Sequence, residues 1–408
     1  MYSQLVIEKR LSALKRQGAV FKRRSIDERR VIVRKLVRLL DTKTETLIRP
    51  LTTAEQEFID SERILCKWDF RYWAEVYGTI ALDSSVGGGV GPMDFWESQN
   101  RALEIISARE EEIGEEFDKH GFSDGIMSIW HKARQLGATT IMRLINMHRM
   151  SLHKHTRSLA ASLDEPKVLE LWEKDFTIIN NLPWFLKPKV FPMVMGSHFG
   201  FDGLSSRIVY QKAGQEGGIG TSQQFDINHC TEVALWAYPE RLKFDLLPAI
   251  PQSPFVFTGW ESTAAGRSGF WYEFTEDIRK RKYGFGHWTY IFTPWYIESR
   301  KYRRAAPDGW EPLAVTTQHA ELVEKTSAEF CGSKRVLGRD QLFWWETEYE
   351  LNRKGGTLHI FLSNFCATPE QSFQHSGGSA FPIETIEWLR SCAIMGMPYH
   401  AAVSGVRV

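Results

Sequence analysis

The sequence predicts an α/β fold built around a largely parallel central sheet. Short apolar runs alternate with amphipathic helical patterns from about residue 92 onward, and a glycine-containing loop, HKARQLGATT, joins one of these runs to a helix. The chain has 408 residues, of which 43% are hydrophobic, so it can bury a large core and form two or three domains.

Residues 1–50 are expected to form a basic helical arm. Ser25 to Glu28 have the form of a capping box, and the apolar residues at 32, 36, 39 and 40 follow helical spacing. Residues 8–43 contain thirteen Lys or Arg against four Asp or Glu, although the net charge of the chain is only +1. Such an arm could bind phosphates or an acidic partner, or it could be a solvated helix face.

The remaining elements follow in order. Residues 51–91 are predicted to be a helical lead-in that ends in the glycine-rich break SSVGGGVGP, and a core domain is expected over 92–310. Strands are predicted at 125–130, 159–163, 207–211, 225–230, 254–260 and 288–292. Helices are predicted between them at 139–150, 165–181, 239–249 and 269–282. Two more helices, at 318–330 and 338–354, belong to an expected lid or linker subdomain over 311–386.

Composition limits the classes of protein that the chain can be. No apolar run reaches the roughly 18 residues that span a bilayer, and the first residues lack the layout of a signal peptide, so an intracellular protein without a membrane partner is expected. The cysteines show neither CxxC nor Cys/His ligand spacing, which favours reduced thiols over a zinc site or disulfides. They are Cys66, Cys230, Cys331, Cys366 and Cys392.

The loop at 131–140 has the features of a phosphate site with a displaced lysine. In the pattern GxxxxGK[ST] a lysine follows the second glycine, whereas here Ala138 follows Gly137 and Lys132 lies five residues before it. Because the two ends of such a loop converge, a lysine on its opening side can reach the same oxygens. Thr139 occupies the position whose hydroxyl coordinates Mg²⁺. The predicted phosphate-binding residues are Lys132, Arg134, Gln135, Gly137, Ala138, Thr139 and Thr140.

Two later segments strengthen this interpretation. The apolar run in QQFDINHCTEVALW ends in Thr231 and Glu232, and a carboxylate at that place can orient the water that attacks ATP. Thr231 replaces the usual aspartate, so it could contact Mg²⁺ only through its hydroxyl or through water. The second segment, FVFTGWESTAAGRSGFWYEF, ends a strand in small hydroxyl residues that could sense a phosphate: Ser262 and Thr263, followed by the turn at Gly266.

In this order and spacing, the three motifs resemble those of the large terminase subunit, the DNA-packaging motor of tailed bacteriophages and herpesviruses. KARQLGATT is similar to that family's variant Walker A loop, HCTEVALW to its Walker B end, and ESTAAG to its coupling motif. Gln99 resembles the glutamine that contacts adenine in the family. The resemblance implies a P-loop ATPase of the RecA or ASCE type, with Glu232 as a catalytic residue and Arg134 on the phosphates or in the transition state.

The resemblance also implies cofactors and partners. These are ATP and Mg²⁺, double-stranded DNA, the portal protein of a procapsid, a small terminase subunit, and further copies of the chain in a pentameric ring, although monomers in solution are common in the family. The protein would act in the host cell cytoplasm and transiently on the procapsid. Whether Lys132 or Arg134 carries most of the phosphate contact stays open.

The C-terminal part departs from the family pattern. TPEQSFQHSGGSAFPIETI, at 368–386, is similar to the family's link between ATPase and nuclease, but only 22 residues follow Ile386 and Glu387 is their one acid. Residues 387–408 are therefore expected to be the truncated start of a nuclease domain, without nuclease activity. Two other functions remain open, namely a helicase or DNA-remodelling ATPase of related fold, and a non-catalytic DNA-binding scaffold.

Overall fold

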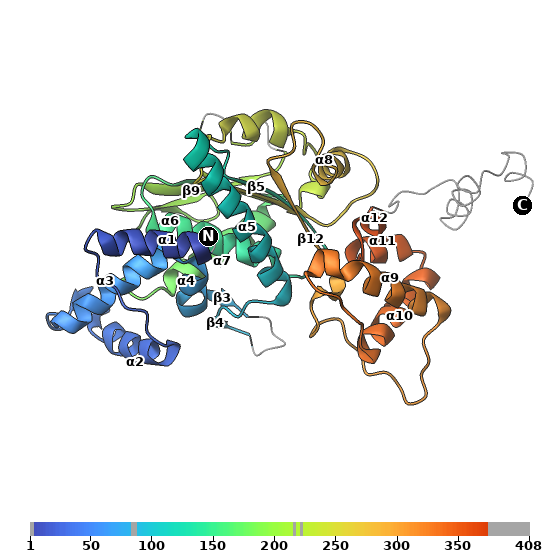
Figure 1. Cartoon of the computed structure of the whole chain (residues 1–408), viewed down its shortest axis with the longest axis horizontal. Helices are drawn as coiled ribbons and strands as arrows, with labels where there is room; N and C mark the ends of the chain where they lie inside the picture. The colour runs from blue at the N-terminus through green and yellow to red at the C-terminus, as the bar shows by residue number, and fades with distance from the viewer. Residues whose placement is uncertain (1–3, 83–87, 215–217, 221–222, 374–408) are drawn as a thin grey trace, which may run out of the picture.

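The computed structural model describes residues 4–82, 88–214, 218–220 and 223–373, and its centre is an eight-stranded sheet (Figure 1). The strands lie in the order β12-β5-β11-β10-β6-β9-β8-β7. All neighbours from β12 to β9 are parallel, while β8 and β7 add an antiparallel edge. The predicted α/β fold with a largely parallel sheet is therefore confirmed.

The six parallel strands match the six predicted apolar runs to within a few residues. They are β5 (Ile126–Lys132), β6 (Arg157–Ser162), β9 (Ser206–Lys212), β10 (Ile227–Thr231), β11 (Phe257–Ser262) and β12 (Trp288–Thr293). The edge strands β7 (Val190–Val194) and β8 (His198–Phe201) were not predicted, because most of β7 is exposed and lacks an alternating pattern.

The order of the strands places β11 between the strand before the phosphate loop and the strand that ends in Thr231. In register, Trp130 of β5 pairs with Glu261 of β11, and Glu261 pairs with Thr231 of β10. An additional strand at this place is the arrangement expected of an ASCE-type P-loop domain. The carboxyl ends of all three strands meet at one edge of the sheet, where ligands of open α/β sheets bind.

Helices cover both faces of the sheet. They are α5 (Glu97–His120), α6 (Ala138–Leu152), α7 (Glu165–Asn180) and α8 (Phe270–Arg279). The helix predicted at 239–249 is wrong, because this segment forms only the short turns η3 (Leu242–Leu246) and η4 (Leu247–Ala249). Pro248 has no backbone N–H to donate, so a regular α-helix cannot continue through it.

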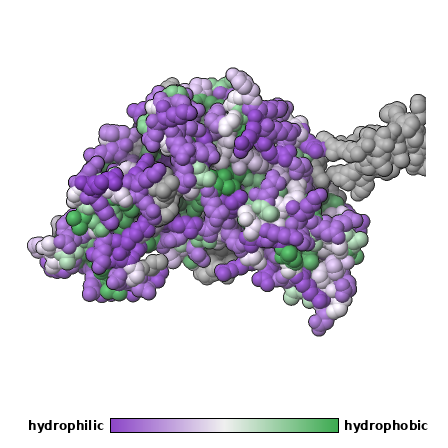
Figure 2. Space-filling model, in the orientation of Figure 1, coloured by the Kyte–Doolittle hydropathy of each residue, from purple (hydrophilic) through white to green (hydrophobic). Residues whose placement is uncertain are grey.

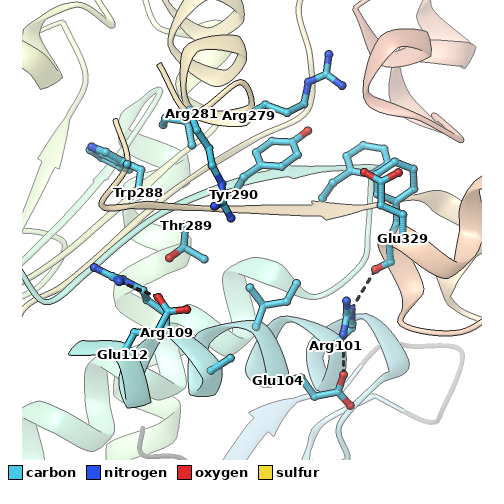
Figure 3. A pocket seen from close by; sticks show the side chains of 16 residues that line it. Arg101, Glu104, Arg109, Glu112, Arg279, Arg281, Trp288, Thr289, Tyr290 and Glu329 are labelled. Carbon is cyan, nitrogen blue, oxygen red and sulfur yellow. Dashed lines mark hydrogen bonds and ion pairs between the residues drawn. The ribbon is translucent and has the colours of Figure 1, made fainter. Parts of the chain in front are cut away.

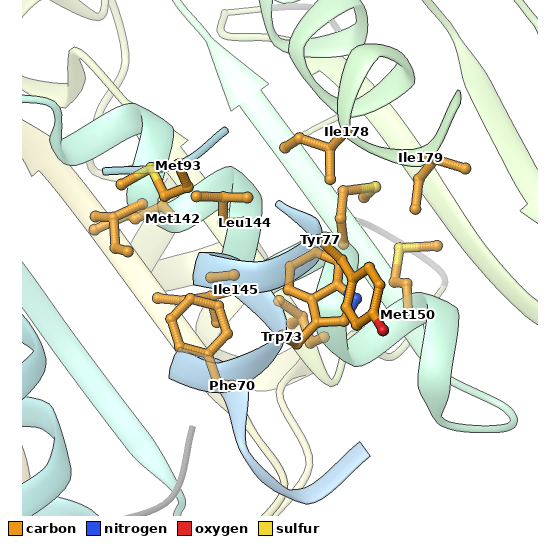
Figure 4. Packing of buried hydrophobic residues seen from close by; sticks show 14 of the residues in the cluster. Phe70, Trp73, Tyr77, Met93, Met142, Leu144, Ile145, Met150, Ile178 and Ile179 are labelled. Atoms are coloured by element: carbon orange, nitrogen blue, oxygen red, sulfur yellow. The ribbon is translucent and has the colours of Figure 1, made fainter. Parts of the chain in front are cut away.

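Helices at the N-terminus share the core of the sheet domain. They are α1 (Gln4–Arg16), α2 (Ile26–Val37), α3 (Thr53–Trp68) and α4 (Phe70–Tyr77), with the small hairpins β1 (Leu40–Asp41) to β2 (Thr46–Leu47) and β3 (Thr79–Ala81) to β4 (Val90–Pro92). The capping box predicted at Ser25 is present. Figure 4 shows Phe70, Trp73 and Tyr77 of α4 lying among buried side chains of α6 and α7, such as Ile145 and Ile178.

The basic arm joins the same hydrophobic cluster. Ile7 and Leu11 of α1 and Leu36 of α2 are buried in it, and the Trp184 indole donates a hydrogen bond to the Leu36 carbonyl oxygen at 2.9 Å. The arm therefore packs on the domain that carries the phosphate loop, while its exposed basic side chains face solvent.

C-terminal helices form a third cluster beside β12 (Figure 1). They are α9 (Ala314–Cys331), α10 (Arg339–Lys354), α11 (Leu358–Asn364) and α12 (Pro369–Ser372). Their buried aromatic residues Trp345 and Phe361 share this cluster with Trp295, which follows β12. Most of the predicted link at 368–386, and all of 387–408, lie outside the described residues.

Surface and cysteine properties agree with the composition. The face in Figure 2 is mostly hydrophilic, with hydrophobic side chains in small separate groups. No helix in the described part of the chain is both long and apolar enough to cross a membrane. Cys66, Cys230, Cys331 and Cys366 are buried free thiols as predicted, and Cys392 lies outside the described residues.

Candidate nucleotide site

The phosphate loop runs from the end of β5 at Lys132 to the start of α6 at Ala138. Gly137 precedes the helix with φ +72°, a left-handed conformation that favours glycine. A Cβ atom there would lie 2.4 Å from Nε2 of Gln99. Gln135 also has a positive φ, at +55°. The loop is therefore tightly turned, and it leads into the N-terminus of a fifteen-residue helix.

Gln99, the predicted adenine contact, holds the loop from the side. Its Nε2 donates to the Gly137 carbonyl oxygen at 3.0 Å, and its Oε1 accepts from the Trp96 backbone N–H at 3.0 Å. The neighbouring Ser98 hydroxyl donates to the Leu136 carbonyl oxygen at 2.9 Å. The first turn of α5 thus fixes the second half of the loop, and an adenine contact of Gln99 stays a prediction.

Arg134 is engaged by the C-terminal helices. Its backbone N–H donates to the Asn364 carbonyl oxygen at 2.9 Å, and its Nε donates to Asn364 Oδ1 at 2.9 Å. The Arg134 carbonyl oxygen accepts from the Tyr302 hydroxyl at 2.6 Å. The guanidinium group is therefore tied to α11, whereas Lys132 is the cation that faces β11.

Lys132 and Thr139 meet at a buried carboxylate that sequence reasoning did not select. Lys132 Nζ lies 3.4 Å from Glu261 Oε2, and the Thr139 hydroxyl donates to Glu261 Oε1 at 2.6 Å. The Glu261 side chain is 0% exposed and that of Lys132 is 14% exposed. The two ends of the loop thus converge as predicted, and they do so on Glu261.

His229 of β10 completes the surroundings of Glu261. Arg143 NH1 lies 3.1 Å from His229 Nδ1, and because a guanidinium can only donate, Nδ1 must accept. His229 Nε2 therefore carries the proton and donates to Glu261 Oε1 at 2.9 Å. Burial lowers the pKa of His229, which keeps the ring neutral. Arg143 also pairs with Asp175 of α7, with Nε donating to Oδ1 at 2.8 Å.

The electrostatics of this cluster keep Glu261 ionised. Burial opposes ionisation of the Glu261 carboxyl, but the Lys132 ammonium and the hydrogen bonds from His229 and Thr139 outweigh it and lower its pKa to about 2. The site therefore contains a buried anion at neutral pH, held beside the lysine of a phosphate loop.

The predicted catalytic residue Glu232 lies directly after β10. It has φ +59° and begins the short turn η2 (Val233–Leu235), while Thr231 before it is buried as the last residue of the strand. The hydrogen bond from Lys167 to Glu170 is the main reason that the pKa of Lys167 is raised, and the Glu232 carboxylate contributes to that shift. Glu232 is thus near the start of α7, one strand beyond Glu261.

Residues of the predicted coupling segment connect three parts of the fold. The Ser262 hydroxyl accepts from the Ala234 backbone N–H at 3.1 Å, two residues after Glu232. The Ser363 hydroxyl of α11 donates to the Ala264 carbonyl oxygen at 2.9 Å. Thr263 is half-buried, and Gly266 has φ +91°. The segment after β11 is therefore bonded both to the end of β10 and to the C-terminal helices.

The residues present fit a magnesium ion shared with a phosphate. Within the described ranges, no group of three or more His, Cys, Asp or Glu side chains could hold a metal ion alone. Mg²⁺, however, is commonly held by one or two protein oxygens together with substrate phosphates and water. The hydroxyl of Thr139 and the carboxylate of Glu261 are such a pair of oxygens.

A separate cavity of about 600 Å³ lies beside the edge strand β12 (Figure 3). Its lining combines Arg101 and Arg109 of α5 with Trp288 and Tyr290 of β12, and none of the predicted phosphate-binding residues contributes to it within the described part of the chain. Arg101 pairs with Glu104 at 3.1 Å, and Arg109 with Glu112 at 2.8 Å. Its charges are largely paired, and the cavity lies apart from the loop at which the chemistry is expected.

No protein-family model matches the chain, and no curated protein matches it. The large terminase of bacteriophage HK97 is similar over 73% of this chain and 54% of its own, at 11% identity and a TM-score of 0.46. The large terminase ATPase domain of Thermus phage P74-26 is similar over 50% and 88%, at 11% and 0.33. The large terminase of another thermophilic bacteriophage, in complex with ADP, is similar over 46% and 45%, at 12% and 0.30.

This chain spans about half the length of the HK97 protein. These likenesses are too distant to assign an activity, so the function is inferred from the chain's own residues.

Proposed function

We propose that the chain is an ATP-hydrolysing motor subunit that moves double-stranded DNA into a viral procapsid. The observation that carries this proposal is the meeting of Lys132, Thr139 and the buried Glu261 carboxylate at the carboxyl edge of a parallel sheet. A cation, a hydroxyl and a carboxylate at the N-terminus of a helix are the groups that bind a nucleotide phosphate with its metal ion.

Each residue then has a role in ATP hydrolysis. Lys132 and the first N–H groups of α6 bind the phosphates, and Thr139 is placed to hold Mg²⁺. Bound Mg²⁺ neutralises charge on the β- and γ-phosphates. Glu232 orients the attacking water. Ser262 and Ala264 pass the loss of the phosphate to the end of β10 and to α11, because these segments are hydrogen-bonded to one another.

The motor would work with the partners that the sequence resemblance implies. These are the portal of a procapsid, a small terminase subunit and further copies of the chain in a ring, in the host cell cytoplasm. Arg134 is tied to α11 and exposed, so it is available to sense a neighbouring subunit or the γ-phosphate if α11 moves.

The central test is ATP hydrolysis by the purified chain, measured alone, with double-stranded DNA and with procapsids that carry a portal. A motor subunit hydrolyses ATP faster with DNA and procapsids together. A remodelling ATPase would respond to DNA alone, and a DNA-binding scaffold would bind DNA without hydrolysing ATP.

Glu232→Gln is expected to keep nucleotide binding and to lower the turnover number by at least about 100-fold, because it removes the group that positions water. The measurements are ADP binding by calorimetry and phosphate release. Glu240→Gln is the matched control, since it makes the same change at a position beyond η2 that is not part of the predicted site. Parent-like turnover of Glu232→Gln would remove Glu232 from the mechanism.

Lys132→Ala is expected to weaken both nucleotide binding and turnover, because it removes the cation that closes the loop. Lys154→Ala, at an exposed position beyond the opposite end of α6, is the control. Hydrolysis by Lys132→Ala at the parent rate would show that another cation carries the phosphate charge, with Arg134 as the next residue to vary.

A further inference from the structure

The end of β10 lacks the acidic residue that normally serves the metal ion of a P-loop ATPase. That group is an aspartate at the end of the strand, which works together with the hydroxyl of the phosphate loop. Here Thr231 occupies the end of β10. The residue that pairs with Thr231 in the neighbouring strand is Glu261, and β11 lies one strand closer to the phosphate loop than β10 does.

We propose that Glu261, on β11, supplies the carboxylate of the magnesium site and takes over the role of the acidic residue missing at position 231. This inference rests on the proposed nucleotide function. It assigns to Glu261 a place in the metal site that the sequence motifs give to the end of β10.

Contacts of Glu261 place its carboxylate where a shared metal ion would lie. Residues paired in adjacent parallel strands point to the same face of the sheet, so Glu261 and Thr231 lie on the same face as His229. Helix α6 covers this face, and its Thr139 hydroxyl bonds to Glu261 Oε1. The two oxygen ligands expected of the site are therefore already in contact.

The second carboxylate oxygen is held in reserve. Glu261 Oε2 is buried and makes no hydrogen bond within the described part of the chain; its contact is the ion pair with Lys132 at 3.4 Å. A buried carboxylate oxygen without a hydrogen bond is costly unless a cation compensates it. When a phosphate engages Lys132, Oε2 loses its compensating charge, and a divalent cation that arrives with the phosphate restores it.

A buried network orients the carboxylate. His229 donates to Oε1, Arg143 fixes the tautomer of His229, and Asp175 in turn pairs with Arg143. Such outer partners orient metal ligands in proteins and raise their affinity for the ion. The network extends from α6 and α7 to Glu261, so the fold supports this carboxylate more extensively than a structural ion pair with Lys132 requires.

The test measures ADP binding to the full chain by calorimetry, in MgCl₂ and in EDTA. In the parent, magnesium is expected to tighten ADP binding. Glu261→Gln should bind ADP in EDTA at least as well as the parent, because it removes a negative charge from the phosphate site, and should lose about tenfold or more of the magnesium-dependent gain. Glu232→Gln, which makes the same change one strand away, should keep that gain.

Electron paramagnetic resonance of Mn²⁺ gives a second readout that does not depend on turnover. Parent and Glu232→Gln are expected to reduce the free Mn²⁺ signal when ADP is present, whereas Glu261→Gln leaves it near that of ADP alone. If Glu261→Gln keeps the full magnesium-dependent gain, the inference is overturned while the nucleotide function stands. If the parent binds no ADP in either buffer, the proposed function itself fails.

Glu261→Asp keeps the inference testable if Glu261→Gln does not fold. The aspartate retains the charge opposite Lys132 but withdraws the carboxylate by one methylene from Thr139. We expect a folded protein whose magnesium-dependent gain falls at least about threefold, since ligand geometry around Mg²⁺ is strict. An unchanged gain in Glu261→Asp would count against Glu261 as a ligand.

Discussion

Gly137 is the single residue on which the shape of the phosphate loop depends. Its φ of +72° is unfavourable for any residue with a Cβ atom, and that atom would press on the Gln99 amide. Gln99 cannot move freely, because both ends of its amide are bonded, to Gly137 and to Trp96. The conformation of the loop and its lateral support are therefore linked at this residue.

Gly137→Ala is expected to lower the free energy of unfolding by about 1 to 3 kcal/mol, through the left-handed conformation and the displaced amide, and to weaken ADP binding at least about tenfold. Urea denaturation and calorimetry measure the two effects. Gly114→Ala is the control, since Gly114 lies within α5 with open space at its Cβ and alanine favours the helix. Unchanged ADP binding by Gly137→Ala would contradict the loop as the phosphate site.

Glu261 shows what sequence reasoning misses at the residue scale. Its motif, ESTAAG, was selected for the hydroxyl residues that follow, because a lone glutamate at the end of an apolar run has no distinctive spacing. Its importance depends on the register that places it beside Thr231 and on its contacts with Lys132 and Thr139. One signal was available, namely that position 231 lacks an acid and a neighbouring strand ends in one.

At the scale of elements, the predictions succeeded where a local pattern decides the structure. The apolar runs of β5, β6 and β10 are buried on both faces, as is typical of parallel strands. The segment at 239–249 failed because Pro248 overrides its apolar pattern. The contact of Arg134 with α11 was not predictable, since it joins residues 230 positions apart in the sequence.

Packing of α9 on α10 contains a buried histidine that makes this unit sensitive to acid. His319 stacks on Trp345 with ring centroids 3.9 Å apart, and burial lowers its pKa to about 3. In the unfolded chain the pKa is about 6.5. Below that value the unfolded state binds a proton that the folded state excludes, so this stability is present above pH 6.5 and is lost as the pH falls toward 3.

His319→Phe is therefore expected to reduce the loss of stability on acidification. The phenyl ring keeps the stacking but cannot take up a proton, so between pH 7.5 and 5 the parent should lose up to about 2 kcal/mol more than the variant. Urea denaturation at both pH values, followed by tryptophan fluorescence, measures the difference. Equal losses in parent and variant would show that His319 titrates alike in both states.

For the whole molecule, the balance of charge hides two kinds of basic residue in the arm. Arg29 is buried, with its guanidinium 4.2 Å from the ring centroid of Tyr72, and Arg23 pairs with Asp69 at 2.7 Å. Both contribute to packing. Arg30, Arg34 and Arg38 are exposed, and their spacing of four residues places them on one side of α2.

We expect replacement of these exposed arginines by glutamine to weaken DNA binding without changing ATP hydrolysis in the absence of DNA. Each lost phosphate contact reduces the slope of log affinity against log salt by about 0.9, so the triple variant should differ from the parent by about 2 to 3. Fluorescence anisotropy of a labelled duplex across a salt series measures this. A triple variant with the slope of the parent would place the DNA contacts elsewhere on the molecule.

Helix α11 contacts the nucleotide site through two consecutive residues. Ser363 bonds the segment after β11, and Asn364 bonds the phosphate loop at Arg134. A rigid body held at two neighbouring points keeps one easy rotation, about the line that joins them. If ATP hydrolysis displaces either point, the axis of that rotation tilts, and the whole C-terminal unit swings in a defined direction. The direction of a power stroke would then be set by the line between Ser363 and Asn364 rather than by the nucleotide.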